Sequence, residues 1–272
     1  MIKKIIACSD IHIRNFKRSE EYVSVLNRFI DDCNEIVNKY GKDEVRIVIA
    51  GDLFHGKLDI SEEGYVLASW FLRKLGEICR TYIIAGNHDM NMENLERLDP
   101  ITAMFNMCNF ENAIYLDKEL SYESGIYTDD NVNFFLYSSF SNFSKPEFAL
   151  TGENSTNIAL YHGVVKNAKN ASGFIFENGL PISHFEGTDF GILGHIHKTQ
   201  ELLYDGNSYV YCGSLLQHEH GESVNGHGYI LIDIDSLTYE QKNIANEEYG
   251  FYTFAINSID DIDNDVEEVV NL

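Results

Sequence analysis

The sequence is poor in basic residues and in proline. Its 272 residues include 20 Lys and Arg against 43 Asp and Glu, so the formal net charge is −23. This balance argues against a protein that binds a polyanion through its overall charge, as nucleic-acid binding proteins do. Only 3 prolines and 20 glycines argue against long disordered linkers.

Long apolar runs are also missing. No run approaches the length of a membrane span, and the apolar stretch after Met1 is too short for a signal peptide. We therefore expect no membrane partner and a cytoplasmic location. The five cysteines are an odd number without a Cys-x-x-Cys pair, which predicts free thiols in a reducing compartment.

Short apolar runs recur along the chain and predict strands that are covered on both faces, because they are continuous rather than alternating. They occupy residues 4–7, 45–50, 82–85, 134–137, 158–161, 191–193, 209–211, 229–232 and 251–254. Apolar stripes predict two helices, one over 22–40 that ends at Gly41 and one over 61–80 that is capped by Ser61.

The order of these elements predicts an α/β fold. The N-terminal half alternates strands and helices, which indicates a largely parallel sheet. After about residue 110 strands dominate, which favours a second and more antiparallel sheet.

Five polar loops each follow an apolar strand directly, where ligands gather in open α/β sheets. They are Ser9–His12, Gly51–His55, Gly86–Asp89, Tyr161–Gly163 and Gly194–His197. Carboxylates, imidazoles and an amide without thiolate suit Mn, Fe or Zn better than Ca. A single Asp-x-His or His-Gly is usually a turn, so the prediction of a metal site depends on the conjunction of all five loops.

Local geometry supports the same prediction. The Asp10–His12 and His195–His197 spacings place both side chains of each pair on one side of an extended segment. The glycines of these loops let backbone pass close to the ions.

These loops, in this order, resemble the calcineurin-like metallophosphoesterases, whose pattern is D-x-H, G-D, G-N-H-D/E, H and G-H-x-H. The resemblance covers roughly residues 4–234 and implies a four-layer αββα sandwich of two mixed β-sheets flanked by helices. We expect a phosphoesterase domain over 1–240. Residues 241–272 would form a C-terminal strand and an acidic tail, the start of a capping domain if the chain is truncated.

The resemblance also implies two divalent metal ions, with Mn expected and Mg, Fe or Zn as alternatives. The implied ligands are Asp10, His12, Asp52 and His197 for one ion, and Asp52, Asn87, His162 and His195 for the other. By the same resemblance His88 assists the leaving oxygen, His55 is a second active-site histidine that binds no metal, and Asp89 orients His88.

Within the superfamily, Gly51–His55 resembles the SbcD-type DNA double-strand-break repair nucleases. The segments 212–217, 221–222, 226–229 and 249–252 look like the recombination endonuclease subunits of large phages. This implies a Mn-dependent DNA exo/endonuclease subunit, in the host cytoplasm if the chain is phage-encoded. The implied partners are DNA, an SbcC-type coiled-coil ATPase and a second copy of the chain.

Basic residues that follow the metal loops offer a way to reconcile this function with the charge of −23. Arg14, Lys57, Lys166 and Lys198 would form a substrate-binding rim, since screening removes distant charge beyond about 8 Å. Solvated loop lysines are an equal alternative. The acidic balance itself favours a metallophosphoesterase for another substrate, a phosphoprotein or a cyclic nucleotide.

Overall fold

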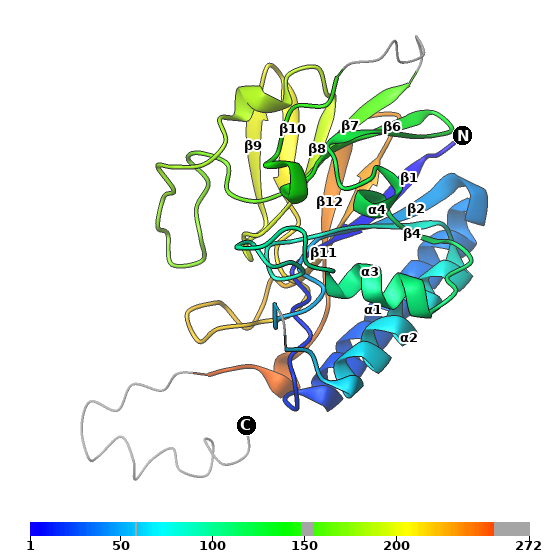
Figure 1. Ribbon diagram of the computed structural model, residues 1–272, viewed down its shortest axis with the longest axis vertical. Coiled ribbons are helices and arrows are strands. Elements are labelled where there is room, and N and C mark those ends of the chain that lie inside the picture. The colour runs from blue at the N-terminus through cyan, green and yellow to red at the C-terminus, as the bar shows by residue number, and fades with distance from the viewer. Residues whose placement is uncertain (58, 148–154, 253–272) are drawn as a thin grey trace.

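Two six-stranded mixed sheets pack face to face, because most of their central strands are apolar on both faces (Figure 1). The computed structural model describes residues 1–57, 59–147 and 155–252. The first sheet has the order β12 (Thr238–Asn243), β11 (Gly228–Asp233), β1 (Lys4–Cys8), β2 (Val45–Ala50), β3 (Thr81–Ile84) and β4 (Ala113–Tyr115). The second has the order β5 (Gly125–Asp129), β6 (Val132–Tyr137), β7 (Thr156–His162), β8 (Phe190–Gly194), β10 (Asn207–Tyr211) and β9 (Gln200–Tyr204).

The two long helices begin and end close to where the sequence predicts. The α-helices are α1 (Ser19–Tyr40), α2 (Glu62–Ile78), α3 (Pro100–Met107) and the short α4 (Leu116–Glu119), and the 3₁₀ turns are η1 (Lys42–Glu44), η2 (Ser139–Ser141), η3 (Ile182–Phe185) and η4 (Glu247–Tyr249). Gly41 ends α1, and the Ser61 hydroxyl accepts from the Gly64 N–H at 3.1 Å to cap α2.

Three apolar layers hold the fold together. Alternate residues of each strand enter different layers, so Ile6 packs under the helices while Ile5 packs between the sheets. The outer face of the second sheet is covered by the 163–189 connection, which contributes Val165 and Phe185. The predicted two mixed sheets flanked by helices, with both faces covered, are confirmed.

The second sheet is not the more antiparallel one, so that expectation was wrong. β6, β7, β8 and β10 pair in parallel, and only the edge strands β5 and β9 are antiparallel. The first sheet likewise combines three parallel pairings with two antiparallel ones. The connections after β6 and β7 contain no α-helix in their described residues, so no helical stripe in the sequence marks these crossovers.

The C-terminal expectations are tested only in part. Phe251 and Tyr252 are not in a strand, while the rest of the predicted strand and the acidic tail lie outside the described residues. The predicted domain boundary at residue 240 falls inside β12, and the division itself stays a prediction. All five cysteines are free, and four are buried, as expected. Among the described residues, no helix combines the length and apolarity needed to cross a bilayer.

A buried ionic cluster joins the two sheets away from the polar loops. Asp129, at the end of β5, is paired with Arg46 of β2 and accepts from the Tyr82 hydroxyl of β3 at 2.7 Å. Burial alone would raise the pKa of Asp129, but the hydrogen bonds from Arg46 and Tyr82 lower it. The amino ends of the central strands are thus closed by a satisfied charge pair, and the carboxyl ends remain for the polar loops.

Candidate metal centre

The five polar loops meet at one edge of the sandwich, where the carboxyl ends of β1, β2, β3, β7 and β8 lie together. The His195 N–H donates to Asp10 Oδ2 at 3.0 Å across 185 residues of sequence. The His88 N–H donates to Asp52 Oδ1 at 2.8 Å. These hydrogen bonds tie loops of both sheets to the two carboxylates, so the predicted convergence is present.

Two sets of candidate ligands that include a carboxylate lie side by side, and His12 also forms a third group with His55 and His88. Asp10, His12 and His197 offer ligand atoms within 4.8 Å of one another, and the Nε2 atoms of the two imidazoles face each other at 3.2 Å. A second set, Asp52, His162 and His195, meets the same limit.

Asp52 is a member of the second set and also lies close to the first. Its Oδ2 lies 3.4 Å from His12 Nε2 and 3.2 Å from His162 Nε2. Asn87 reaches the second set through its side-chain oxygen, 2.7 Å from His195 Nδ1. This places Asp52 where one carboxylate would bridge two cations.

The chemistry of these donors fits bound cations. His162 Nδ1 lies 2.7 Å from the Ala50 carbonyl, which only accepts, so Nδ1 carries the hydrogen. Its Nε2 is buried and lies 3.2 Å from Asp52 Oδ2 in a geometry that makes no hydrogen bond. A buried imidazole nitrogen in this position beside a carboxylate is suited to bind a metal ion. The seven predicted ligands are therefore placed to hold divalent cations.

The electrostatics show how the cluster balances charge by itself. Burial would lower the pKa of His162, but the Asp52 and Asp10 carboxylates raise it to about 10. Burial would raise the pKa of Asp52, but the charge of His162 lowers it to about 2. A proton on His162 thus offsets the carboxylates, and metal binding would release it.

The backbone of the loops is left-handed at several ligands and not extended. The expectation that the Asp10–His12 and His195–His197 pairs lie on extended segments was therefore wrong. Asp10, His12, Asp52 and His195 have φ of 52°, 50°, 54° and 94°. Such conformations cost about 1–2 kcal/mol per residue, and the hydrogen bonds to the carboxylates offset them. A Cβ at Gly86 would meet Asp52 Oδ1 at 2.0 Å, so the loop glycine admits a ligand side chain.

His88 and His55 stack beside the first ligand set, with ring centroids 5.3 Å apart and planes at 21°. His88 Nδ1 lies 2.7 Å from the His55 carbonyl, which fixes the ring. Burial, together with the charge of Arg14, lowers the pKa of His55 to about 4, so this imidazole is neutral near pH 7.

Asp89 does not orient His88, contrary to the prediction. Its buried carboxylate instead accepts the backbone N–H groups of Leu53, Phe54 and Gly86 at 2.9–3.1 Å. Asp89 therefore joins the second and third loops, and the His55 carbonyl supplies the contact that holds His88.

Two site residues escaped the sequence prediction. His218 is buried, and its Nε2 lies 2.8 Å from the Asp10 carbonyl. Glu222 Oε1 lies 2.7 Å from His197 Nδ1, and Oε2 accepts the His218 N–H at 2.7 Å. Glu222 belongs to the 221–222 segment, whose resemblance to phage endonuclease subunits was its only sequence signal, and His218 lies just after the 212–217 segment.

The predicted cationic rim is uneven. Arg14 lines the cavity at the ligand sets. Burial is the main cause that lowers the pKa of His88, and the charge of exposed Lys57 also contributes. Lys198 lines an adjoining cavity beside His197. Lys166 is exposed on the 163–180 segment and no described contact joins it to the ligand sets.

Two mixed sheets whose strand ends gather two Asp/His ligand sets define a metallophosphoesterase, a hydrolase of phosphoesters that uses divalent metals. The comparison with family models agrees, since the model described as calcineurin-like phosphoesterase matches residues 3–199. The chain belongs to this family.

Individual relatives add little about substrate. The chain is 34% identical over 265 residues to "Uncharacterized protein R555" of Acanthamoeba polyphaga mimivirus, covering 94% of this chain but 19% of that protein. The inner-membrane-complex anchor GAP50 of Plasmodium is similar in fold, with a TM-score of 0.50, 10% identity and 90% of each chain covered. A novel archaeal phosphodiesterase covers 89% of this chain and 99% of its own at 13% identity, with a TM-score of 0.42.

Glu222 should control metal affinity through His197. We expect Glu222→Gln to weaken Mn²⁺ binding about 10–100-fold, because the carboxylate fixes the ring and raises its basicity. Titration against a fluorescent chelator measures this affinity. The control is Glu219→Gln, which removes an exposed carboxylate from a cavity that Glu222 also lines. Equal weakening in both variants would mean that general charge, and not the His197 contact, is responsible.

Proposed function

We propose that the chain is a Mn-dependent DNA exo/endonuclease subunit of an SbcCD-type recombination and repair complex. The observation that carries the proposal is the His55–His88 pair beside the first ligand set. Neither ligand set that includes a carboxylate contains this pair, and the resemblance of Gly51–His55 implies that both histidines belong to the active site of the nuclease branch without binding metal. The chain spans 19% of the length of its mimivirus relative, so nothing about the activity of a longer protein is taken from it.

The predicted ligands would hold two divalent cations, with Asp52 between them. Such cations supply positive charge for the phosphoryl oxygens and activate water for in-line attack. The chain's own contribution is to hold the ligands rigidly. Asp10 accepts hydrogen bonds from the Ser9 hydroxyl at 2.5 Å and from the His195 N–H, so its carboxylate has little freedom to rotate.

His88 is placed to act on the leaving oxygen. Since the His55 carbonyl only accepts, His88 Nδ1 carries a hydrogen, and Nε2 remains for the substrate. Burial lowers the pKa of His88, and a bound phosphodiester anion would raise it again. The protonated ring then donates from Nε2 to the departing oxygen, while neutral His55 packs against it and keeps its orientation.

Replacing His88 tests this role. We expect His88→Gln to keep Mn²⁺ affinity and to lose about 10²–10⁴-fold in turnover of a phosphodiester, which is the usual contribution of a general acid. The control is His184→Gln, which changes a histidine on η3 whose Nε2 contacts the Phe143 carbonyl. Near-normal turnover by His88→Gln would remove His88 from the mechanism.

A second candidate is a metallophosphoesterase for another substrate, and the net charge of −23 favours it. We expect the Mn²⁺-loaded protein to cleave linear DNA and bis(4-nitrophenyl) phosphate, to leave a phosphopeptide intact, and to lose all activity in a chelator. Release of phosphate from the phosphopeptide without DNA cleavage would favour the second candidate over the nuclease.

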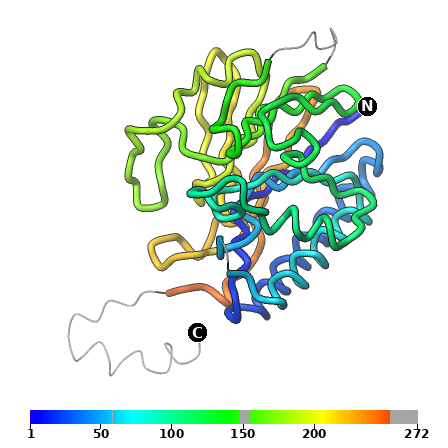
Figure 2. The backbone as a smooth tube through the Cα atoms, in the orientation of Figure 1, coloured from blue at the N-terminus to red at the C-terminus, as the bar shows by residue number. Residues whose placement is uncertain are grey.

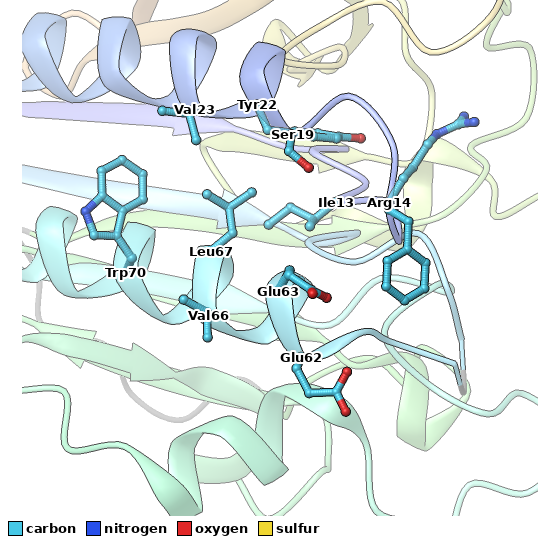
Figure 3. A pocket seen from close by; sticks show the side chains of 12 residues that line it. Ile13, Arg14, Ser19, Tyr22, Val23, Glu62, Glu63, Val66, Leu67 and Trp70 are labelled. Atoms are coloured by element: carbon cyan, nitrogen blue, oxygen red, sulfur yellow. The ribbon is translucent and has the colours of Figure 1, made fainter.

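The proposal includes three partners: DNA, a coiled-coil ATPase and a second copy of the chain. Only the resemblance supports the ATPase as a partner. An apolar groove of about 540 Å³ between α1 and α2 supports the second copy (Figure 3). On α2, Phe71 is in the core, whereas Trp70 is only partly buried and lines this groove.

Charge favours self-association over another occupant. Arg14 and the pair Glu62 and Glu63 line the same groove, so a copy related by a two-fold axis can set its glutamates against this arginine. Phe16 and Val66 are 77% and 67% exposed, which is costly for apolar side chains left in water.

The oligomeric state tests the groove. We expect a dimer by light scattering at micromolar concentration, and a monomer for Val66→Glu, which places a charge in the groove. Leu203→Glu is the matched control, since Leu203 is equally exposed but lies on β9. A monomeric wild-type chain, or a Val66→Glu variant that remains dimeric, would contradict the proposed surface.

A further inference from the structure

A second hollow adjoins the cavity at the metal centre. The first has a volume of about 180 Å³ and the second about 170 Å³. They share His195, His197 and Glu219 as lining residues, so the second hollow lies directly beside the ligand sets. The far side of the second hollow is formed by Asn170, Ala171, Ser172 and Phe176.

The 163–180 segment holds that far wall in place. Figure 2 shows it as a yellow-green loop that projects on the same side as the amber loop around residues 217–227. Its base is fixed to β9, because Gln200 accepts the Lys169 N–H at 2.9 Å and donates to the Lys169 carbonyl at 2.6 Å. Its tip is fixed by the Asn170 side-chain oxygen, which accepts from Ser172 Oγ at 2.8 Å and from the Phe174 N–H at 2.9 Å.

The chemistry of the hollow suits a neutral aromatic ring and not a second phosphate. Glu219 and Glu222 line it, and both would repel an anion. Half-buried Phe176 supplies an aromatic surface, and the Asn170 carboxamide supplies a polar edge. A cavity of about 150 Å³ is enough for one benzene ring, so the hollow has room for a single base.

We infer that this hollow binds the nucleobase of the nucleotide whose phosphate lies at the metal centre, with Phe176 as the stacking surface. The inference rests on the proposed nuclease function. On this inference, the nucleotide that is cleaved turns its base out of the duplex stack and into the hollow. Base stacking on an aromatic side chain contributes on the order of tenfold in affinity or more.

Ligand binding tests the hollow without any turnover. The probes are thymidine 5′-monophosphate and methyl phosphate, which share the phosphate monoester and differ in the nucleoside. Calorimetry with the Mn²⁺-loaded protein should give a Kd about tenfold lower for the nucleotide. Phe176→Leu keeps an apolar side chain of similar size for folding and should bring the two Kd values together.

Phe174→Leu is the matched control. Phe174 lies on the same segment in edge contact with Phe176, at 5.3 Å between ring centroids, but it does not line the hollow. This variant should keep the preference for the nucleotide. Equal affinity of the wild-type protein for both probes, or a preference that survives Phe176→Leu, would overturn the base site.

Calorimetry and the DNA-cleavage assay together separate the two proposals. A protein that cleaves DNA but binds both probes equally keeps the nuclease function and loses the base site. A protein that prefers the nucleotide through Phe176 but cleaves no DNA keeps the base site and loses the nuclease function.

Discussion

The fold depends on two carboxylates, Asp10 and Asp52, buried at the joint between the sheets. Both are at most 2% exposed, and an uncompensated charge at such depth would be costly. Hydrogen bonds from Ser9, His88 and His195 offset part of that cost. Because these donors belong to loops of both sheets, the hydrogen bonds to the two carboxylates also join the sheets at the site.

The rest of the molecule keeps this joint rigid. Apolar residues fill the space between the sheets, and Asp129 closes their far end with Arg46 and Tyr82. Asp89 fixes two of the loops by three backbone hydrogen bonds. Strained residues such as His12 and Asp52 keep their left-handed conformations because their surroundings allow no other.

Much of the site could be predicted from the sequence, because the information is local. Each ligand loop follows a strand whose apolar run is visible, and parallel strands bring their carboxyl ends to one edge. The predicted ligands Asp52, His162 and His195 therefore meet, although up to 143 residues (195 − 52) separate them. The helix ends at Gly41 and Ser61 could also be predicted from the sequence, since capping is a short-range interaction.

What the sequence could not predict depends on contacts between distant segments. The parallel pairing of β6, β7 and β8 is hidden because no helical pattern marks the connections between them. Glu222 lies 25 residues after His197, in a loop without strand or helix periodicity, so nothing in the pattern pairs them. The resemblance implied that Asp89 orients His88, yet the Asp89 carboxylate accepts backbone N–H groups of two loops instead.

If Asp52 bridges two cations held by the two ligand sets, Mn²⁺ ions bound at the site should be magnetically coupled. Electron paramagnetic resonance of the metal-free protein titrated with Mn²⁺ measures this coupling. We expect two coupled ions per chain, as for ions about 3.5–4 Å apart. One ion per chain, or two ions with independent six-line spectra, would contradict it.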